Sequence, residues 1–277
     1  YLKVPSVISA AEITNVDAIH PGYGYLAENA YFAEVCEACH IKFIGPSPEI
    51  IRLMGNKTKA RAVMAQAGLK ILPGSPGSVE SLEQAVKIAS DIGYPIIIKA
   101  IAGGGGRGMR VVKAQEDLKT AFSTAQNEAQ VGFGVSDVYI EKYLGNPRHI
   151  EFQIMGDQYG KVIHFGEREC SIQRRHQKLV EEAPSVVVDQ ECRMKMGQLV
   201  EEALASVGYS NAGTVEFLVD EDLNFYFVEV NTRIQVEHPV TEMVTGLDLV
   251  KMQIQIAAGK ALEREEKIQL KGHSIEC

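Results

Sequence analysis

The stretch IIIKAIAGGGGRGMRVV, residues 96–112, holds a run of glycines between two segments rich in β-branched residues. Read as Gly103-x-Gly105-x-x-Gly108, it matches the dinucleotide-binding fingerprint, but that fingerprint must open a helix and these glycines lead into a strand-like segment. A Walker loop would end in Gly-Lys followed by Ser or Thr, whereas this run ends in Gly-Met. The pattern therefore predicts a glycine-rich tip that joins two strands of a hairpin.

This tip is longer than a turn requires. Two residues are enough to close a hairpin, and each glycine costs about 0.5–1 kcal/mol of ordering entropy. Glycines without a Cβ let backbone N–H groups approach phosphate oxygens, and Lys99, just before the tip, supplies positive charge. We therefore expect a phosphate-binding lid in preference to a plain surface turn.

The residues around the tip predict a small α+β lobe. The cluster ILPGSPGS at 71–78 is typical of a crossing between domains. Beyond it we expect a helix over 82–93, a strand over 94–100, the tip, a strand over 109–113, a helix over 114–129 and a strand over 137–144. We place this lid lobe at residues 72–143.

A second hairpin, TVEFLVDEDLNFYFVEVN at residues 214–231, carries two carboxylates and an amide. A four-residue loop over 221–224 makes the numbers of paired residues sum to 445, which places Glu216 opposite Glu229. Asn231 then shares the face of Glu229. Facing carboxylates repel unless a cation or a shared proton joins them, and all-oxygen ligation suits Mg²⁺ or Mn²⁺ completed by a nucleotide triphosphate. The hairpin therefore predicts a divalent-cation site.

The rest of the chain predicts an α/β start and an antiparallel end. The expected elements of the first part are helices over 4–14, 48–55 and 57–67, a helix that includes 32–39, and strands over 17–24 and 41–45. After residue 144 we expect strands over 149–156 and 161–169 and helices over 191–208 and 240–259. The motif CEACH at 36–40 fits covalent haem attachment, but helical spacing of its apolar residues favours a buried core helix.

Composition bounds the class of protein. The 277 residues have a net charge of −8, which argues against a nucleic-acid face, and no apolar run reaches the length of a membrane span. Five cysteines, an odd number, without a secretory signal indicate reduced thiols, so we expect a cytoplasmic protein. Tyr1 opens the chain inside an expected helix and Cys277 closes it inside an expected strand, so we expect a piece of a longer protein.

These features resemble the ATP-grasp fold and, more narrowly, biotin carboxylase. The stretches that carry the resemblance span nearly the whole chain: HPGYGYLAEN (20–29), GGGGRGM (103–109), EKYLGNPRHIE (141–151), ERECSIQRRHQKLVEEAP (167–184) and EVNTRIQVEHPVTE (229–242). The resemblance implies a mixed α/β and α+β fold in four parts. They are the tail of an N-terminal Rossmann-like domain (1–45), linker helices (46–71), a mobile lid (72–143) and an incomplete antiparallel-sheet lobe (144–277).

The resemblance also implies an activity. It is the ATP-dependent carboxylation of biotin, carried on biotin carboxyl carrier protein, by bicarbonate through carboxyphosphate. The implied cofactors are ATP and Mg²⁺ or Mn²⁺, and the implied partners are the carrier protein, a carboxyltransferase and a second copy in a homodimer. The stretch VEEAP (180–184) favours acetyl-CoA carboxylase and fatty-acid synthesis, with pyruvate, propionyl-CoA and methylcrotonyl-CoA carboxylases as alternatives.

The resemblance assigns roles to particular residues. Those expected around ATP are Lys57, Lys99, Gly104, Gly105, Gly106, Met109, Glu141, Lys142, Leu144, His149, Gln173 and Leu218. Those expected to hold the metal are Glu216, Glu229 and Asn231. The catalytic assignments are Arg233 as the bicarbonate-binding fork, Glu237 as general base, and Lys178 and His176 near the reacting centre. Five more residues are expected to line the pocket for bicarbonate and biotin: Tyr23, Gly24, Glu28, Gln235 and Val236.

Three other classes stay open at this point. Another ATP-grasp ligase, such as a carbamoyl phosphate synthetase or a purine carboxylation enzyme, would share the lid and the metal carboxylates. A non-catalytic nucleotide-binding remnant and a Rossmann oxidoreductase are the remaining alternatives. The chain also departs from the family pattern, because Ala102 replaces one glycine of the run and an arginine expected directly after Cys277 lies beyond the sequence.

Overall fold

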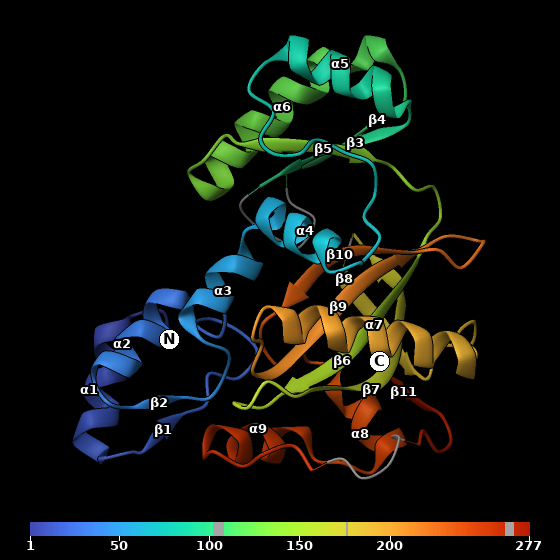
Figure 1. The fold of residues 1–277 in the computed structure, drawn as a ribbon. Coiled ribbons are helices and arrows are strands. Elements are labelled where there is room, and N and C mark those ends of the chain that lie inside the picture. The colour runs from blue at the N-terminus through green and yellow to red at the C-terminus, as the bar shows by residue number, and fades with distance from the viewer. Residues whose placement is uncertain (102–107, 176, 264–268) are drawn as a thin grey trace.

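The longest alternating segments of the chain form one six-stranded antiparallel sheet, with strand order β10-β9-β6-β7-β8-β11 (Figure 1). The computed structural model describes residues 1–101, 108–175, 177–263 and 269–277. The strands of this sheet are β6 (Arg148–Gly156), β7 (Val162–Arg174), β8 (Gln177–Ala183), β9 (Asn211–Val219), β10 (Phe225–Asn231) and β11 (Ser274–Glu276). Sequence reasoning anticipated five of these strands, β11 among them, and predicted no strand for β8.

The two faces of this sheet have different neighbours because side chains alternate along each strand. On β6, Ile150, Phe152 and Ile154 belong to the core cluster that includes Val200 and Leu204 of α7 (Gln190–Ser206). Met155 belongs to a second cluster, with side chains of α9 (Leu249–Ala257). The helix α8 (His238–Thr245) packs against β7, β8 and β11 and, like α9, lies below the sheet in Figure 1. The polar side chains of β6 that alternate with these apolar ones, His149, Glu151 and Gln153, point to the face opposite α7 and are available to form a functional site.

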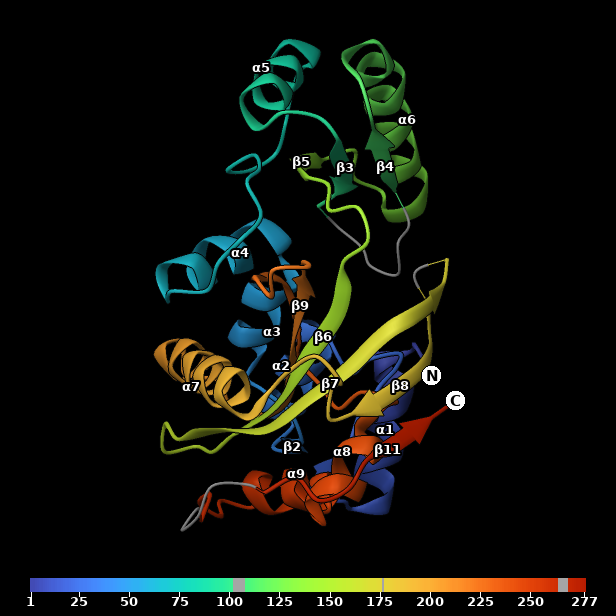
Figure 2. The same ribbon diagram turned by 90° about the vertical axis from the view of Figure 1, so that its right-hand side faces the viewer.

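A small lobe above this sheet contains a three-stranded antiparallel sheet, with order β4-β3-β5. Its elements are α5 (Leu82–Ile92), β3 (Ile96–Ala100), β4 (Met109–Val112), α6 (Gln115–Phe133) and β5 (Val138–Lys142). Figure 2 shows α5 and α6 on the outer face of its sheet, where their alanines and Leu118 and Phe122 bury Ile96 and Ile98. The antiparallel pairing of β3 with β4, from Ile96–Val112 to Lys99–Met109, confirms the predicted hairpin. The tip itself, 102–107, lies outside the described residues.

The first part of the chain packs beside the large sheet. Its elements are α1 (Val4–Thr14), β1 (Ala18–Ile19), α2 (Ala30–Ala38), β2 (Lys42–Phe43), α3 (Pro48–Gly55) and α4 (Lys57–Gln66). The strands β1 and β2 are parallel and shorter than expected, because in the described part of the chain each pairs only with the other. Cys36 is fully buried in α2 among apolar side chains, which confirms the core-helix interpretation of CEACH.

Two local predictions were wrong. The helix expected over 240–259 is interrupted, because Gly246 adopts a left-handed φ of 73° and Asp248 caps a new helix by accepting a hydrogen bond from the Lys251 N–H. The hairpin 214–231 starts with Phe225 opposite Val219, one residue away from the expected register, because Asp220 leaves the ladder. A bulge between Phe227 and Glu229 then restores the predicted pairing of Glu229 with Glu216.

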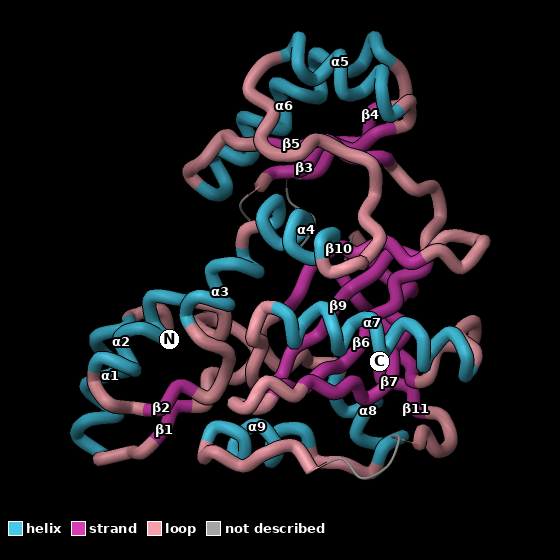
Figure 3. Tube along the Cα trace, in the orientation of Figure 1, coloured by secondary structure: helices cyan, strands magenta, loops and turns pink. Residues whose placement is uncertain are grey.

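The small lobe is joined to the rest of the chain by two loop segments, before α5 and after β5, which Figure 3 shows in pink. Bridges from Ile71 to Phe227 and from Gly74 to Glu141 anchor the first of them. Among the helices that the structure describes, none is both long enough and apolar enough to cross a membrane.

Candidate active site

A cavity of about 670 Å³ lies between the sheet of the small lobe and the six-stranded sheet. Most residues assigned from the resemblance line it: Tyr23, Lys57, Lys99, Met109, Glu141, Lys142, Leu144, His149, Gln173, Lys178, Glu216, Leu218, Glu229, Asn231, Arg233, Gln235, Val236 and Glu237. Gly104, Gly105, Gly106 and His176 lie outside the described residues, so their placement stays a prediction. The fold thus makes residues that are far apart in the sequence, from Tyr23 to Glu237, line the same cavity.

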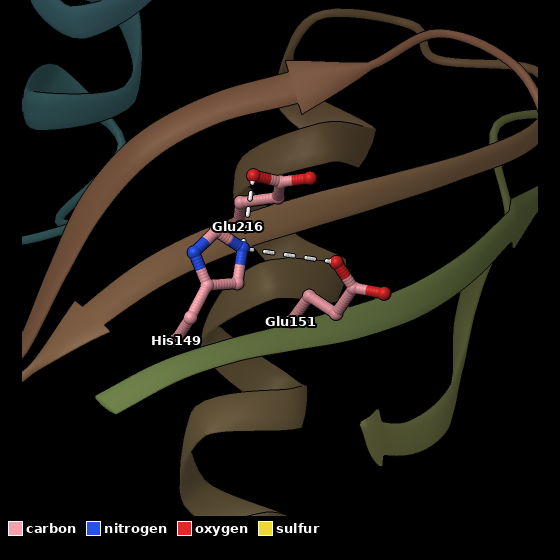
Figure 4. Close-up of side chains that lie close together, drawn as sticks. All are labelled: His149, Glu151 and Glu216. Atoms are coloured by element: carbon pink, nitrogen blue, oxygen red, sulfur yellow. Dashed lines mark ion pairs between the residues drawn. The ribbon is translucent and has the colours of Figure 1, made fainter. Parts of the chain in front are cut away.

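Neighbouring strands supply the polar floor of the cavity. His149 and Glu151 extend from β6 and Glu216 extends from β9, and their side chains point toward one another (Figure 4). The His149 Nε2 atom lies 3.0 Å from Glu216 Oε2 and 3.9 Å from Glu151 Oε2. The three ligand-bearing atoms are close enough to hold a metal ion, but the ammonium of Lys178 already lies among these carboxylates.

Lys178 on β8 contacts three carboxylates at once. Its Nζ donates to Glu151 at 2.5 Å, to Glu216 at 2.9 Å and to Glu237 at 2.6 Å. Burial alone would lower the pKa of Lys178, but the surrounding carboxylates, chiefly Glu151 and Glu216, raise it. Lys178 is therefore a fixed cation that joins the floor of the cavity to Glu237.

Glu216 is the most heavily engaged of these carboxylates. Besides Lys178 and His149, it accepts hydrogen bonds from Asn231 Nδ2 at 2.8 Å and from Gln235 Nε2 at 2.9 Å. Burial raises the pKa of Glu216, but Lys178 and His149 outweigh burial and hold it well below its usual value. The same contact acts on the partner, because Glu216 raises the pKa of His149 against the effect of burial.

Glu229 lies opposite Glu216 in the strand pairing but in a more open setting. Its carboxylate is 29% exposed and lies 3.3 Å from the Lys57 ammonium at the start of α4. Asn231 is two residues further along β10, and its Oδ1 accepts from Arg233 at 3.2 Å. Two carboxylates and an amide oxygen on adjacent strands form a donor set that fits a hard divalent cation such as Mg²⁺.

The upper end of the cavity belongs to the small lobe and α4. Glu141 on β5 accepts from Arg61 NH1 at 2.7 Å and also from Lys99 of β3. The Lys142 ammonium donates to the backbone carbonyls of Gly93 and Tyr94, each at 3.0 Å. The charged ends of Glu141 and Lys142 are thus engaged within the protein.

The N-terminal part of the chain reaches the opposite end. Tyr23 lines the cavity, and Glu28 accepts from the Thr232 N–H at 2.9 Å and from Arg233 Nε at 3.0 Å. Gly24 was predicted to line the pocket, but it does not, because only the side chain of Tyr23 extends from this loop into the cavity. Glu28 acts on the site through Arg233 and does not line the cavity itself.

Sequence reasoning missed four charged residues of this site: Arg61, Glu151, Arg168 and Glu181, of which Glu181 lines the cavity. Glu151 was detectable, because His149, Glu151 and Gln153 alternate with apolar residues and so share one face of a strand. Arg61 and Arg168 gave no comparable local signal, since each binds partners that are distant in the sequence. A two-lobed fold in which a small antiparallel lobe and a larger antiparallel sheet enclose one polar cavity defines the chain as an ATP-grasp protein.

Comparison with known families agrees with this class. The family model described as "Carbamoyl-phosphate synthase L chain, ATP binding domain" matches residues 56–265, and the model "Biotin carboxylase, N-terminal domain" matches residues 1–51. The chain belongs to the biotin carboxylase family of ATP-grasp proteins. A biotin carboxylase of Nostoc sp. is 56% identical over 278 residues, which covers 100% of this chain and 62% of the relative.

Solved structures show the same similarity. The crystal structure of a biotin carboxylase–β-γ-ATP complex from Campylobacter jejuni has a TM-score of 0.98 and is 54% identical in sequence. The match covers 100% of this chain and 62% of the Campylobacter chain. The biotin carboxylase domain dimer of the Hydrogenobacter thermophilus 2-oxoglutarate carboxylase, in complex with MgADP, ADP and bicarbonate, has a TM-score of 0.97 at 53% identity and is matched over 61% of its chain. The chain therefore spans about three fifths of the length of these relatives.

Proposed function

We propose that the full-length protein containing this chain catalyses the ATP-dependent carboxylation of biotin by bicarbonate, the first half-reaction of a biotin-dependent carboxylase. The observation that carries the proposal is that one cavity, of about 670 Å³, collects the residues that this reaction needs. The cavity is lined by two lysines, by two facing carboxylates and by the proposed catalytic residues: Lys57, Lys99, Glu216, Glu229, Arg233 and Glu237. The names of the relatives support the same activity.

The nucleotide is proposed to bind between the two lobes. Because the side chains of Glu141 and Lys142 are engaged with other protein groups, an adenine beside β5 would meet their backbone, together with Leu144 and Leu218. Lys57 and Lys99 would contact the phosphates. Each lysine already pairs with a carboxylate of the protein, so phosphate binding exchanges one anionic partner for another.

Glu216, Glu229 and Asn231 are proposed to hold Mg²⁺ or Mn²⁺. When bound, the cation supplies positive charge that offsets the charge of the phosphate oxygens during transfer. The register of β9 with β10 fixes the two carboxylates opposite each other, and the Asn231 amide is oriented by its bonds to Glu216 and Arg233. This arrangement of the three side chains supports the proposal that they hold the cation.

Arg233 and Glu237 are proposed to act on bicarbonate. The guanidinium of Arg233, held by Glu28, offers a planar fork for a carboxylate-like anion, and Glu237 takes the bicarbonate proton as general base. A bicarbonate oxygen then bonds to the γ-phosphorus while the bond from that phosphorus to ADP breaks, which gives carboxyphosphate. Carboxyphosphate would split into CO₂ and inorganic phosphate, the phosphate would take the proton of a biotin ring N–H, and that nitrogen would bond to CO₂. An enclosed cavity would protect carboxyphosphate from water.

The partners are proposed on the same basis. The biotin would arrive on biotin carboxyl carrier protein, and a carboxyltransferase would consume the product. We propose a homodimer, because the Hydrogenobacter relative is described as a domain dimer, and acetyl-CoA as final acceptor, which only the stretch VEEAP supports. Relatives named for 2-oxoglutarate and pyruvate carboxylase share this domain, so the acceptor is chosen outside it. The cytoplasmic location stays a prediction.

The test uses the purified full-length protein with free biotin. We expect ADP release from MgATP that requires bicarbonate and increases with biotin. Glu237→Gln should lower kcat by about 10²–10⁴-fold because the general base is lost, whereas Glu221→Gln, an exposed carboxylate in the β9–β10 loop, should leave it unchanged. ADP release that requires ammonia or a ribonucleotide would identify another ATP-grasp ligase, and nucleotide binding without turnover would identify a non-catalytic binder.

A further inference from the structure

We infer that Arg168 is the positioning residue of this site, a buried guanidinium that orients Lys178 and Glu216 through Glu151 and Gln235. Arg168 lies on β7, has no solvent exposure and does not line the cavity. The inference rests on the proposed function, which it deepens by naming the group behind the floor of the cavity.

Every donor of the guanidinium has a partner. Arg168 Nε donates to Glu151 Oε1 at 2.6 Å, and NH1 donates to Gln153 Oε1 at 2.7 Å and to Thr241 Oγ1 at 3.0 Å. NH2 donates to Thr214 Oγ1 at 3.2 Å and to Gln235 Oε1 at 3.0 Å. Arginine has five N–H donors in a rigid fork, so this one residue links β6, β9, α8 and the loop after β10.

The contact with Gln235 decides which way its amide faces. Arg168 carries only donors, so the Gln235 oxygen must face it, and the amide nitrogen is turned to Glu216 Oε1 at 2.9 Å. Without Arg168 the amide would lose the partner that sets its orientation. One of the hydrogen bonds that hold the proposed metal ligand Glu216 therefore depends on Arg168.

The contact with Glu151 decides where Lys178 lies. Arg168 holds Glu151 Oε1, which leaves Oε2 to accept from Lys178 at 2.5 Å. Without Arg168, Glu151 would be a buried carboxylate whose nearest cation is Lys178, with His149 Nε2 further away at 3.9 Å, and it would draw that ammonium away from Glu237. The lysine beside the proposed general base would then be misplaced, although no residue that touches substrate had been changed.

The experiment compares Arg168→Met, Glu151→Gln and the double variant in the full-length protein. We expect Arg168→Met to lower kcat of bicarbonate-dependent ADP release by roughly 100-fold, the loss expected for a displacement of about 1 Å in a reacting site. Affinity for ADP without metal should stay within about threefold, because no partner of Arg168 lies at the small-lobe end of the cavity. Thr241→Val, which removes a partner of Arg168 outside the cavity, should keep kcat within about threefold.

The double variant separates positioning from general damage. If Arg168 acts through Glu151, the double variant should lose about as much activity as the stronger single variant, whereas independent defects would multiply. Because Arg168→Met leaves a buried carboxylate short of partners and can fail to fold, the same cycle is run with Arg168→Lys, which keeps the charge but reaches fewer partners. An intermediate kcat for Arg168→Lys supports the inference.

Three outcomes overturn the inference without affecting the proposed function. The first is a folded Arg168→Met or Arg168→Lys protein with kcat within about threefold of the unaltered protein, and the second is losses that multiply in the cycle. ADP affinity that falls as steeply as kcat would also overturn it, since that result indicates general loosening of the fold. An unaltered protein that releases no ADP with bicarbonate would overturn the proposed function, and the positioning role with it.

Discussion

The two carboxylates proposed to hold the metal differ sharply in their surroundings, and this difference yields a strong prediction. Glu216 is buried and contacts Lys178, His149, Asn231 and Gln235. Glu229 is 29% exposed, and its ion pair with a lysine is 3.3 Å long. Changing each to glutamine removes one negative charge from the same proposed metal site but from unlike environments.

The expected cost in stability follows from these contacts. Removing one partner of a buried ion pair costs about 3–5 kcal/mol. In Glu216→Gln, however, Lys178 keeps Glu151 and Glu237, and the new amide oxygen still accepts hydrogen bonds, so we expect a loss of about 2–4 kcal/mol. Glu229→Gln breaks only a partly exposed pair, and such pairs contribute about 0–1 kcal/mol.

The assay measures unfolding and metal-dependent binding on the full-length variants. Thermal unfolding at neutral pH without nucleotide should show a lower Tm for Glu216→Gln, at about 2–4 °C for each kcal/mol lost. Glu229→Gln should unfold within about 2 °C of the unaltered protein. Calorimetric titration with ADP should show that both variants lose most of the extra affinity that Mg²⁺ confers, because each removes a ligand of the cation.

Two results would refute this reasoning. Equal losses of Tm in both variants would show that burial and partner number do not distinguish the two sites. A Glu229→Gln protein that retains the full Mg²⁺-dependent gain in ADP affinity would show that Glu229 is not a metal ligand. Glu221→Gln, on an exposed loop, is the control for the loss of one charge.

Three further predictions concern other parts of the chain. Burial raises the pKa of Asp157, but three backbone N–H donors outweigh burial and lower it. The resulting stability is present above the unfolded-state pKa and is lost as pH falls through the folded-state pKa. Asp157→Asn should therefore lower the free energy of unfolding by urea at neutral pH and remove part of its decline in acid. Gly156→Ala would press a Cβ against the Tyr209 carbonyl oxygen and should cost about 1–3 kcal/mol in urea unfolding. Arg61→Met leaves Glu141 with Lys99 as its remaining side-chain partner and should weaken ADP binding in calorimetry by about tenfold.

Two of these variants, Gly156→Ala and Arg61→Met, have a matched control. Gly132→Ala meets no atom within 4 Å near the end of α6 and should be neutral or stabilising by up to about 1 kcal/mol. Lys59→Met removes an exposed charge from the same helix as Arg61 and should leave ADP affinity unchanged. An Asp157→Asn protein with unaltered pH dependence, a Gly156→Ala protein of full stability or an Arg61→Met protein of full ADP affinity would contradict the corresponding prediction.

The sequence by itself determined the features that depend on neighbouring residues. Glycines followed by Met109–Val112 excluded a helix-opening fingerprint and predicted the β3–β4 hairpin, since β-branched residues favour strands. Alternation along β9 and β10 predicted that Glu216 and Glu229 share one face. The resemblance supplied most of the residues that line the cavity, while their roles stay proposals. These signals succeed because periodicity and turn chemistry act over a few residues.

Only the tertiary structure decided how these segments meet. The predicted register was wrong at Phe225 and right at Glu229, because a bulge at Val228 inserts one residue that no local pattern indicated. Lys178 meets Glu151 and Glu216 only because the strand order places β6 between β9 and β7, with β8 beside β7. Such contacts depend on which strands become neighbours, and that depends on burial across the whole chain, which local sequence does not encode.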